Sequence, residues 1–313
     1  MSSPPHAHVK TKSRYALLSV GSNATLIVLK LLCGIFTGSV AIISEAVHSL
    51  LDLMASFLTF SAVRVSEHPP DADHPFGHGK AENLAALLEA ILIVAGGLYI
   101  VREAIMGLIR GVELPNVALG VYVMFFSSLV NFFISRTLFR VGKKTNSPAL
   151  MADGWHLRTD VYTSLSIMAA LLAIHLGSLI NPAWELDFID SVAALVVSFF
   201  IVKTGWTLGW NAAANLIDHS LSPEELALIR EHIEEFAPKI QGYRRLRTRR
   251  AGPFQIVEVD LLVDGRLPVS EAHAIGEKVV LGIQEHYPKA DITFHLEPVE
   301  TSAHLGDDAP TSP

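Results

Sequence analysis

Six long apolar runs constrain the fold of this 313-residue chain more than any other feature. A helix needs about 20 largely apolar residues to cross the ~30 Å hydrocarbon core of a bilayer. Hydrophobic residues make up 50% of the sequence and charged residues only 18%, which is typical of a polytopic membrane protein. The sequence therefore predicts a membrane all-α six-helix bundle, with spans over residues 15–35, 38–63, 84–105, 117–138, 150–180 and 188–206.

Basic residues predict how these spans are oriented. Most of them fall on the N-terminal side of the membrane: Lys10, Lys12, Arg14, Arg64, Lys80, Arg136, Arg140, Lys143 and Lys144. The opposite side offers little beyond Arg102 and Arg110. By the positive-inside rule, we expect both termini in the cytoplasm.

The chain changes character after Trp210, where a second domain is predicted. Ser222 and Glu225 form a capping-box pattern at the start of a helix over 222–236. Strand patterns over 243–249 and 254–263, a helix over 270–286 and a strand over 291–298 follow, giving a cytoplasmic α+β domain of α-β-β-α-β order. The predicted division is a disordered tail (1–13), the membrane domain (14–210), a linker (211–221), the α+β domain (222–299) and a disordered tail (300–313).

Two polar pairs interrupt the second and fifth apolar runs. His48 lies four residues before Asp52, and His156 four residues before Asp160, so each pair projects from one face of its helix. A charged group at bilayer depth costs about 2.5 to 3.5 kcal/mol on insertion scales, which favours a functional role. Two imidazoles and two carboxylates suit a borderline cation such as Zn²⁺, although a hydrogen-bonded His/Asp couple between helices is the structural alternative.

Composition excludes several other classes of protein. The formal net charge of -7 gives no nucleic-acid signature. The single cysteine, Cys33, allows neither a disulfide framework nor a thiolate cluster within one chain. Glu45 and Glu89 are further acids within spans, and we expect each to serve packing or a proton path.

Five motifs together resemble one family over about residues 14–299: VHSLLD (47–52), HPFGHGKAE (74–82), ADGWHLRTD (152–160), RTRRAGP (247–253) and FHLEP (294–298). The chain is similar to the cation diffusion facilitators, metal-ion/proton antiporters of the inner or organelle membrane. The resemblance implies a homodimer in a bacterial inner membrane with a metallochaperone-like C-terminal domain. It implies metal ions and protons as partners, with Zn²⁺ or a similar divalent cation as substrate and possible regulator rather than a prosthetic group.

The resemblance also assigns residues to sites. The transport site is expected at His48, Asp52, His156 and Asp160, with a histidine at position 48 associated with zinc preference. A loop metal site is expected at Asp71, His74 and His78, for which a solvated, helix-capping loop is the alternative. Lys80 and Asp218 match a charge pair at the dimer interface.

The cytoplasmic domain carries a further set of expected ligands: Asp260, His273, His295 and Glu297. Arg244 stands where a close relative offers histidine, so we expect one metal there or weaker binding. Surface histidines without a ligand role are the alternative reading of His273 and His295.

The leading functional hypothesis is efflux of Zn²⁺ in exchange for H⁺, because a metal needs neutral imidazole and ionised carboxylate at the groups that bind protons. Efflux of Fe²⁺, Co²⁺ or Cd²⁺ by the same mechanism is the alternative. A membrane metal sensor and an intramembrane metalloenzyme are further alternatives. An enzyme would need an open coordination position, which four ligands in two matched pairs do not leave.

Overall fold

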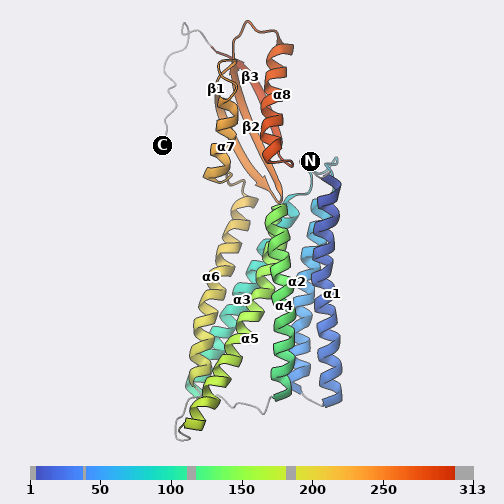
Figure 1. Ribbon diagram of the computed structural model, residues 1–313, viewed down its shortest axis with the longest axis vertical. Coiled ribbons are helices and arrows are strands. Elements are labelled where there is room, and N and C mark those ends of the chain that lie inside the picture. Colours follow the sequence, from blue (N-terminus) through green and yellow to red (C-terminus); the bar gives the residue numbers. More distant parts are fainter. Residues whose placement is uncertain (1–4, 38–39, 111–117, 181–187, 300–313) are drawn as a thin grey trace. The chain divides into compact units, whose positions relative to one another are not determined.

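The computed structural model describes residues 5–37, 40–110, 118–180 and 188–299, and the predicted tail over 300–313 lies outside them. The described residues form two compact units, which are divided between Ile217 and Asp218. The first unit contains six helices of 27 to 33 residues. They are α1 (Pro5–Thr37), α2 (Val40–Ser66), α3 (Lys80–Arg110), α4 (Ala118–Thr145), α5 (Pro148–Ile180) and α6 (Phe188–Leu216), drawn in Figure 1.

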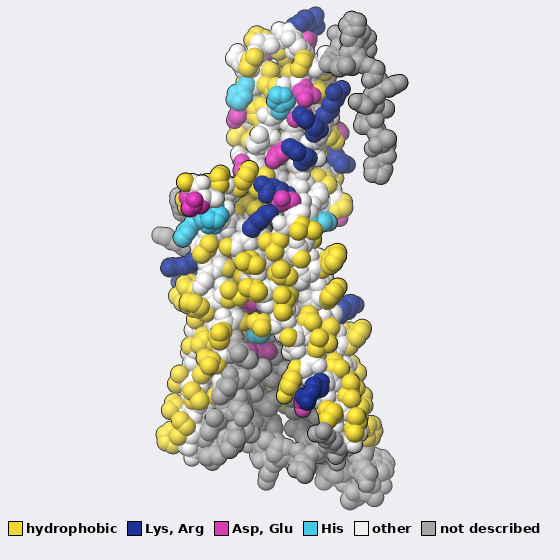
Figure 2. All heavy atoms as spheres, turned by 180° about the vertical axis from the view of Figure 1, so that it is seen from behind, with side chains coloured by type: hydrophobic (Ala, Val, Ile, Leu, Met, Phe, Trp, Pro, Cys, Tyr) yellow, Lys and Arg dark blue, Asp and Glu magenta, His cyan; other side chains and the backbone are white. Residues whose placement is uncertain are grey.

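Three of these helices contain a described segment long and apolar enough to cross a membrane: Lys12–Cys33, Lys80–Ile109 and Ser191–Leu216. Hydrophobic side chains cover much of the surface of the helical unit shown in Figure 2. Apolar side chains that face outward rather than into a core are stable in lipid, so the unit is built for a membrane. The six-span count itself stays a prediction.

Two predicted boundaries are wrong. Helix α1 already begins at Pro5, so residues 5–13 are helical rather than part of a disordered tail. Within this segment, the fully buried ammonium group of Lys12 is paired with Glu82 of α3, which ties this part of α1 to the helical unit. Helix α6 continues to Leu216, so residues 211–216 extend the helix and do not form a linker.

Glycines set the close packing of α3 against α6. A methyl group at Gly97 of α3 would lie 2.7 Å from Val202 Cγ2, and one at Gly205 of α6 would lie 2.8 Å from Val94 Cγ2. Small residues let two helix backbones approach closely in a membrane, where van der Waals packing holds helices together. The other four helices pack mainly as α1 on α2 and α4 on α5, with α2 also contacting α5.

The second unit follows the predicted α-β-β-α-β order, which confirms an α+β domain. It consists of α7 (Pro223–Glu234), β1 (Ile240–Ala251), β2 (Phe254–Val263), α8 (Val269–His286) and β3 (Asp291–Pro298). The sheet order is β1-β2-β3, with β1 antiparallel and β3 parallel to β2. The core joins Ile229 of α7 and Ile283 of α8 to Val257 of β2. The predicted capping box is present, because Ser222 accepts from the Glu225 backbone and Glu225 accepts from the Ser222 backbone.

Candidate metal-binding sites

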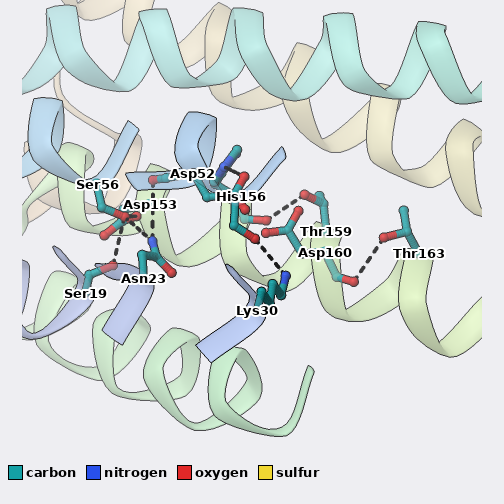
Figure 3. Close-up of polar contacts among 11 residues, drawn as sticks. Ser19, Asn23, Lys30, Asp52, Ser56, Asp153, His156, Thr159, Asp160 and Thr163 are labelled. Atoms are coloured by element: carbon teal, nitrogen blue, oxygen red, sulfur yellow. Dashed lines mark hydrogen bonds and ion pairs between the residues drawn. The ribbon is translucent and has the colours of Figure 1, made fainter. Parts of the chain in front are cut away.

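The polar interruptions of α2 and α5 meet inside the helical unit. Asp52 of α2 and His156 and Asp160 of α5 each offer one ligand atom, and these atoms all lie within 4.8 Å of one another. His156 Nε2 is 3.3 Å from Asp52 Oδ1. Figure 3 shows the three side chains converging between the two helices. This spacing suits three ligands of one cation.

Burial makes this group costly unless a cation or a proton compensates it. Asp52 is only 8% exposed, and the side chain of His156 is 13% exposed. In the described part of the chain, His156 Nδ1 is buried and has no hydrogen-bond partner. The side chain of His48 lies outside the described residues, although helix α2 places it one turn from Asp52.

Neighbouring polar groups hold the α2 side of this site. Asn23 of α1 donates to Ser56 Oγ at 2.8 Å and to the backbone oxygen of Asp52 at 3.4 Å. Lys30 of α1 donates to Ser49 Oγ at 2.7 Å (Figure 3). Helix α1 therefore holds the turns of α2 on which Asp52 lies, and the imidazole of His156 meets the same carboxylate from α5.

The loop between α2 and α3 brings together a second group of three ligands. Ligand atoms of Asp71, His74 and His78 lie within 4.8 Å of one another. Asp71 Oδ1 accepts from the His74 backbone at 2.7 Å, and this hydrogen bond lowers the pKa of the Asp71 carboxyl. Asp71 is therefore ionised at neutral pH and available to a metal. The ring of His68 packs edge-on against that of His78, with 5.9 Å between the ring centroids.

The four ligands expected in the α+β unit are not gathered in the same way. Of the described residues, only the two groups above have three ligand atoms within this spacing. Arg245 Nε donates to Asp260, and its Nη2 lies 3.4 Å from Glu297 Oε1. His273 instead lies near Glu277, one turn along α8. The guanidinium group of Arg245 thus pairs with both of the carboxylates that were expected to bind metal.

Lys80 and Asp218 fall in different units. Lys80 donates to the backbone oxygen of Leu216 at 3.0 Å, and Asp218 accepts from Arg249 at 3.1 Å. Their predicted pairing across a dimer interface stays a prediction.

Comparison with known proteins decides the family. Residues 16–217 match the family model of the cation efflux transmembrane domain, and residues 221–299 match that of the cation efflux protein cytoplasmic domain. The chain belongs to the cation diffusion facilitator family. It is therefore a membrane transporter for the efflux of divalent cations and not an enzyme, and its second unit is the family's dimerisation domain.

Relatives of this cation diffusion facilitator match over nearly their full lengths. It is 31% identical over 297 residues to the cation-efflux pump FieF of Pectobacterium atrosepticum, covering 95% of both chains. It is 33% identical over 286 residues to the uncharacterized transporter sll1263 of Synechocystis, covering 91% of this chain and 90% of that one. Among solved structures, the metal-bound C-terminal domain of the CzcD transporter from Thermotoga maritima is 29% identical. That match covers 26% of this chain and all of the domain, with a TM-score of 0.24.

Sequence reasoning missed two residues around the sites of this cation diffusion facilitator, Lys30 and Arg245. Lys30 is an isolated charged residue in an apolar helix, and that isolation was the available signal for a role. The interhelical hydrogen bond expected of Asn23 is confirmed by its contact with Ser56 of α2. No periodicity distinguishes Arg245 from its neighbours, because the segment 244–250 contains five arginines.

Proposed function

We propose that this protein exports Zn²⁺ in exchange for H⁺ at a site formed by His48, Asp52, His156 and Asp160. The observation that carries the proposal is the convergence of the Asp52, His156 and Asp160 ligand atoms within 4.8 Å between helices α2 and α5. Imidazole nitrogen favours zinc and its neighbours over Mg²⁺ and Ca²⁺, which prefer all-oxygen sites. A site without thiolates also holds zinc loosely enough to release it. Fe²⁺, Co²⁺ and Cd²⁺ are the alternative substrates.

Proton exchange follows from the same ligands. Zinc binds neutral imidazole and ionised carboxylate, so protons and metal compete for the same atoms. In this mechanism, metal arriving from the cytoplasm displaces protons, the helices rock to expose the site to the other side, and protons there displace the metal. The basic residues near the N-terminal side support six spans with both termini in the cytoplasm of a bacterium and the spans in its inner membrane.

The remaining predicted sites are regulatory in this proposal. Asp71, His74 and His78 form a loop site that binds cytoplasmic zinc. The ligands Asp260, His273, His295 and Glu297 act only where zinc displaces the Arg245 guanidinium from its carboxylates. In the homodimer, Lys80 and Asp218 pair near the interface, so Asp218→Ala weakens the dimer in a dilution series followed by light scattering.

The test of the proposal is metal uptake into proteoliposomes under an imposed pH gradient, with zinc compared with cobalt, iron and cadmium. Zinc uptake is expected to need the gradient and to be lost in Asp160→Asn, which keeps the shape of the side chain but removes its charge. Glu103→Gln, at an exposed carboxylate of α3, is the matched control and retains uptake. Normal zinc uptake by Asp160→Asn contradicts the site, and uptake of cobalt, iron or cadmium without zinc contradicts the choice of metal.

A further inference from the structure

Two more carboxylates lie fully buried beside the metal site. Glu89 of α3 and Asp153 of α5 are both 0% exposed. Hydroxyl groups hydrogen-bond both acids: Thr59 of α2 donates to Glu89 Oε1, and Ser56 of α2 donates to Asp153 Oδ1 at 3.0 Å. The hydroxyl of Ser19 on α1 is a further hydrogen-bond partner of Asp153. Figure 3 shows Asp153 on the Ser56 side of Asp52, next to Ser19 and Asn23 of α1.

Each of these acids has a second oxygen without a partner. In the described part of the chain, Glu89 Oε2 and Asp153 Oδ2 are buried and make no hydrogen bond. An ionised carboxylate costs far more free energy to bury without partners than a protonated, neutral carboxyl group does. Two unpartnered acid oxygens in a buried position are therefore groups that favour binding a proton.

The charges around the two acids come from the metal site and from each other. The charged groups that act on Glu89 are Asp153 and His156, both on α5. Among the described residues of α2 and α6, only the Thr59 hydroxyl makes a polar contact with Glu89. Neither helix places a further charged group beside it. Asp153 faces His156 on its own helix and Asp52 on α2. None of these neighbouring groups is a lysine or an arginine that could neutralise Glu89 or Asp153. A metal cation bound near His156 would therefore add the positive charge that these two acids lack.

An apolar layer separates these acids from the ion cluster of Lys12, Glu67 and Glu82. On each of three helices, a buried apolar residue lies in the sequence between a polar residue of the Lys12 cluster and one near the acids. Ala16 has this place on α1, Ala62 and Val63 on α2, and Ala85 on α3. Leu138 and Leu150 complete this layer. The acids thus belong electrostatically to the metal site and not to the Lys12 cluster.

We propose that Glu89 and Asp153 form a proton-binding site that is separate from the metal ligands and is coupled to them by charge. The site holds a proton while the metal site is empty. His156 follows Asp153 by three residues, which is about 4.5 Å along the axis of α5. The positive charge of a divalent cation bound at His156 therefore favours the ionised form of the acid. The O–H bond breaks, the carboxylate keeps the electron pair, and the proton leaves to water on the side from which the metal entered. This inference rests on the proposed exchange of zinc for protons.

The experiment measures protons moved per zinc ion in proteoliposomes, with a pH-sensitive dye and a zinc-sensitive dye enclosed together. In Glu89→Gln and Asp153→Asn we expect fewer protons per zinc, lower by up to one, while zinc uptake driven by a zinc gradient continues. Glu89→Asp retains an acid and should restore the wild-type ratio, which a purely structural role for Glu89 would not produce. Glu103→Gln is the control with an unchanged ratio.

The outcomes separate the two proposals. A wild-type protein that moves zinc without protons overturns both the exchange and this site. A wild-type protein that exchanges protons, with the same ratio in Glu89→Gln and Asp153→Asn, overturns only the separate site. If Glu89→Gln does not fold, Asp153→Asn decides by the same ratio. The proton site is also overturned if Glu89 and Asp153 bind zinc themselves. In that case a bound zinc ion remains in Asp160→Asn and is lost in the double variant Asp160→Asn/Asp153→Asn.

Discussion

Lys12 is the cation of a buried ion cluster that joins helices at one end of the membrane unit. Its Nζ lies 2.7 Å from Glu82 Oε1 and 2.5 Å from Glu67 Oε1, and the three side chains are 0%, 0% and 11% exposed. Ser66 Oγ donates to Glu82 at 2.8 Å, and Ser147 Oγ donates to the other oxygen of Glu82. Removing the cation would leave two carboxylates buried together.

We predict that Lys12→Met lowers the free energy of unfolding by about 3 to 5 kcal/mol, the usual cost of breaking a buried ion pair from one side. Met keeps an unbranched chain and removes only the charged end. The loss corresponds to a change of roughly two to four orders of magnitude in the unfolding equilibrium. The double variant Lys12→Met/Glu82→Gln should be more stable than the sum of the two single losses predicts, because it leaves fewer uncompensated charges.

The assay is unfolding of the purified protein in mixed micelles with increasing SDS, followed by fluorescence of its four tryptophans. Arg102→Met is the matched control, since Arg102 pairs with Glu103 on the surface with side chains 68% and 50% exposed. An exposed pair contributes about 0 to 1 kcal/mol. A Lys12→Met loss no larger than that of Arg102→Met would refute the argument from burial.

Two further predictions concern packing and pH. Gly97→Ala should destabilise the helical unit by about 1 to 3 kcal/mol in the same SDS assay, because the added methyl meets Val202 of α6 at 2.7 Å. Gly96→Ala, with nothing within 4 Å, should not, and equal losses in both would contradict the close α3–α6 contact. In the α+β unit, the hydrogen bond from Arg266 lowers the pKa of Asp264 from 3.8 to about 2. Because this pKa is lower in the folded state, the ionised Asp264 stabilises the fold above about pH 4, and this stability is lost as the pH falls toward 2. In Asp264→Asn, the melting temperature should therefore decrease less between about pH 4 and pH 2 than in the wild-type protein.

The sequence alone predicted most of the secondary structure, because the signals for it are local. Long apolar runs indicate helices, and Ser222 with Glu225 placed the start of α7 correctly. The α-β-β-α-β order could be read from periodicity in each segment. The ends were less predictable: α1 begins at Pro5, and Lys12 near this end pairs with Glu82, which is 70 residues away and cannot be inferred from local sequence.

The sequence also identified the ligand types of the candidate metal site, since His and Asp spaced four apart share a helix face by geometry alone. Only the tertiary structure decides that α2 and α5 pack so that His156 Nε2 lies 3.3 Å from Asp52 Oδ1. Helix periodicity says which face carries a residue but not which helix that face meets.

The α+β unit shows the same limit most clearly. The sequence showed only that Arg244 stands where a close relative offers a histidine ligand, whereas in the structure the neighbouring Arg245 pairs with Asp260. The register of β1 against β2 is irregular between Arg244 and Arg247, and Arg245 has a φ of 46°. An irregularity of this kind changes the face to which a side chain points, because successive strand residues alternate between faces. The sequence therefore determined the elements and the chemistry of their side chains, whereas strand register and helix packing decided which of those side chains meet.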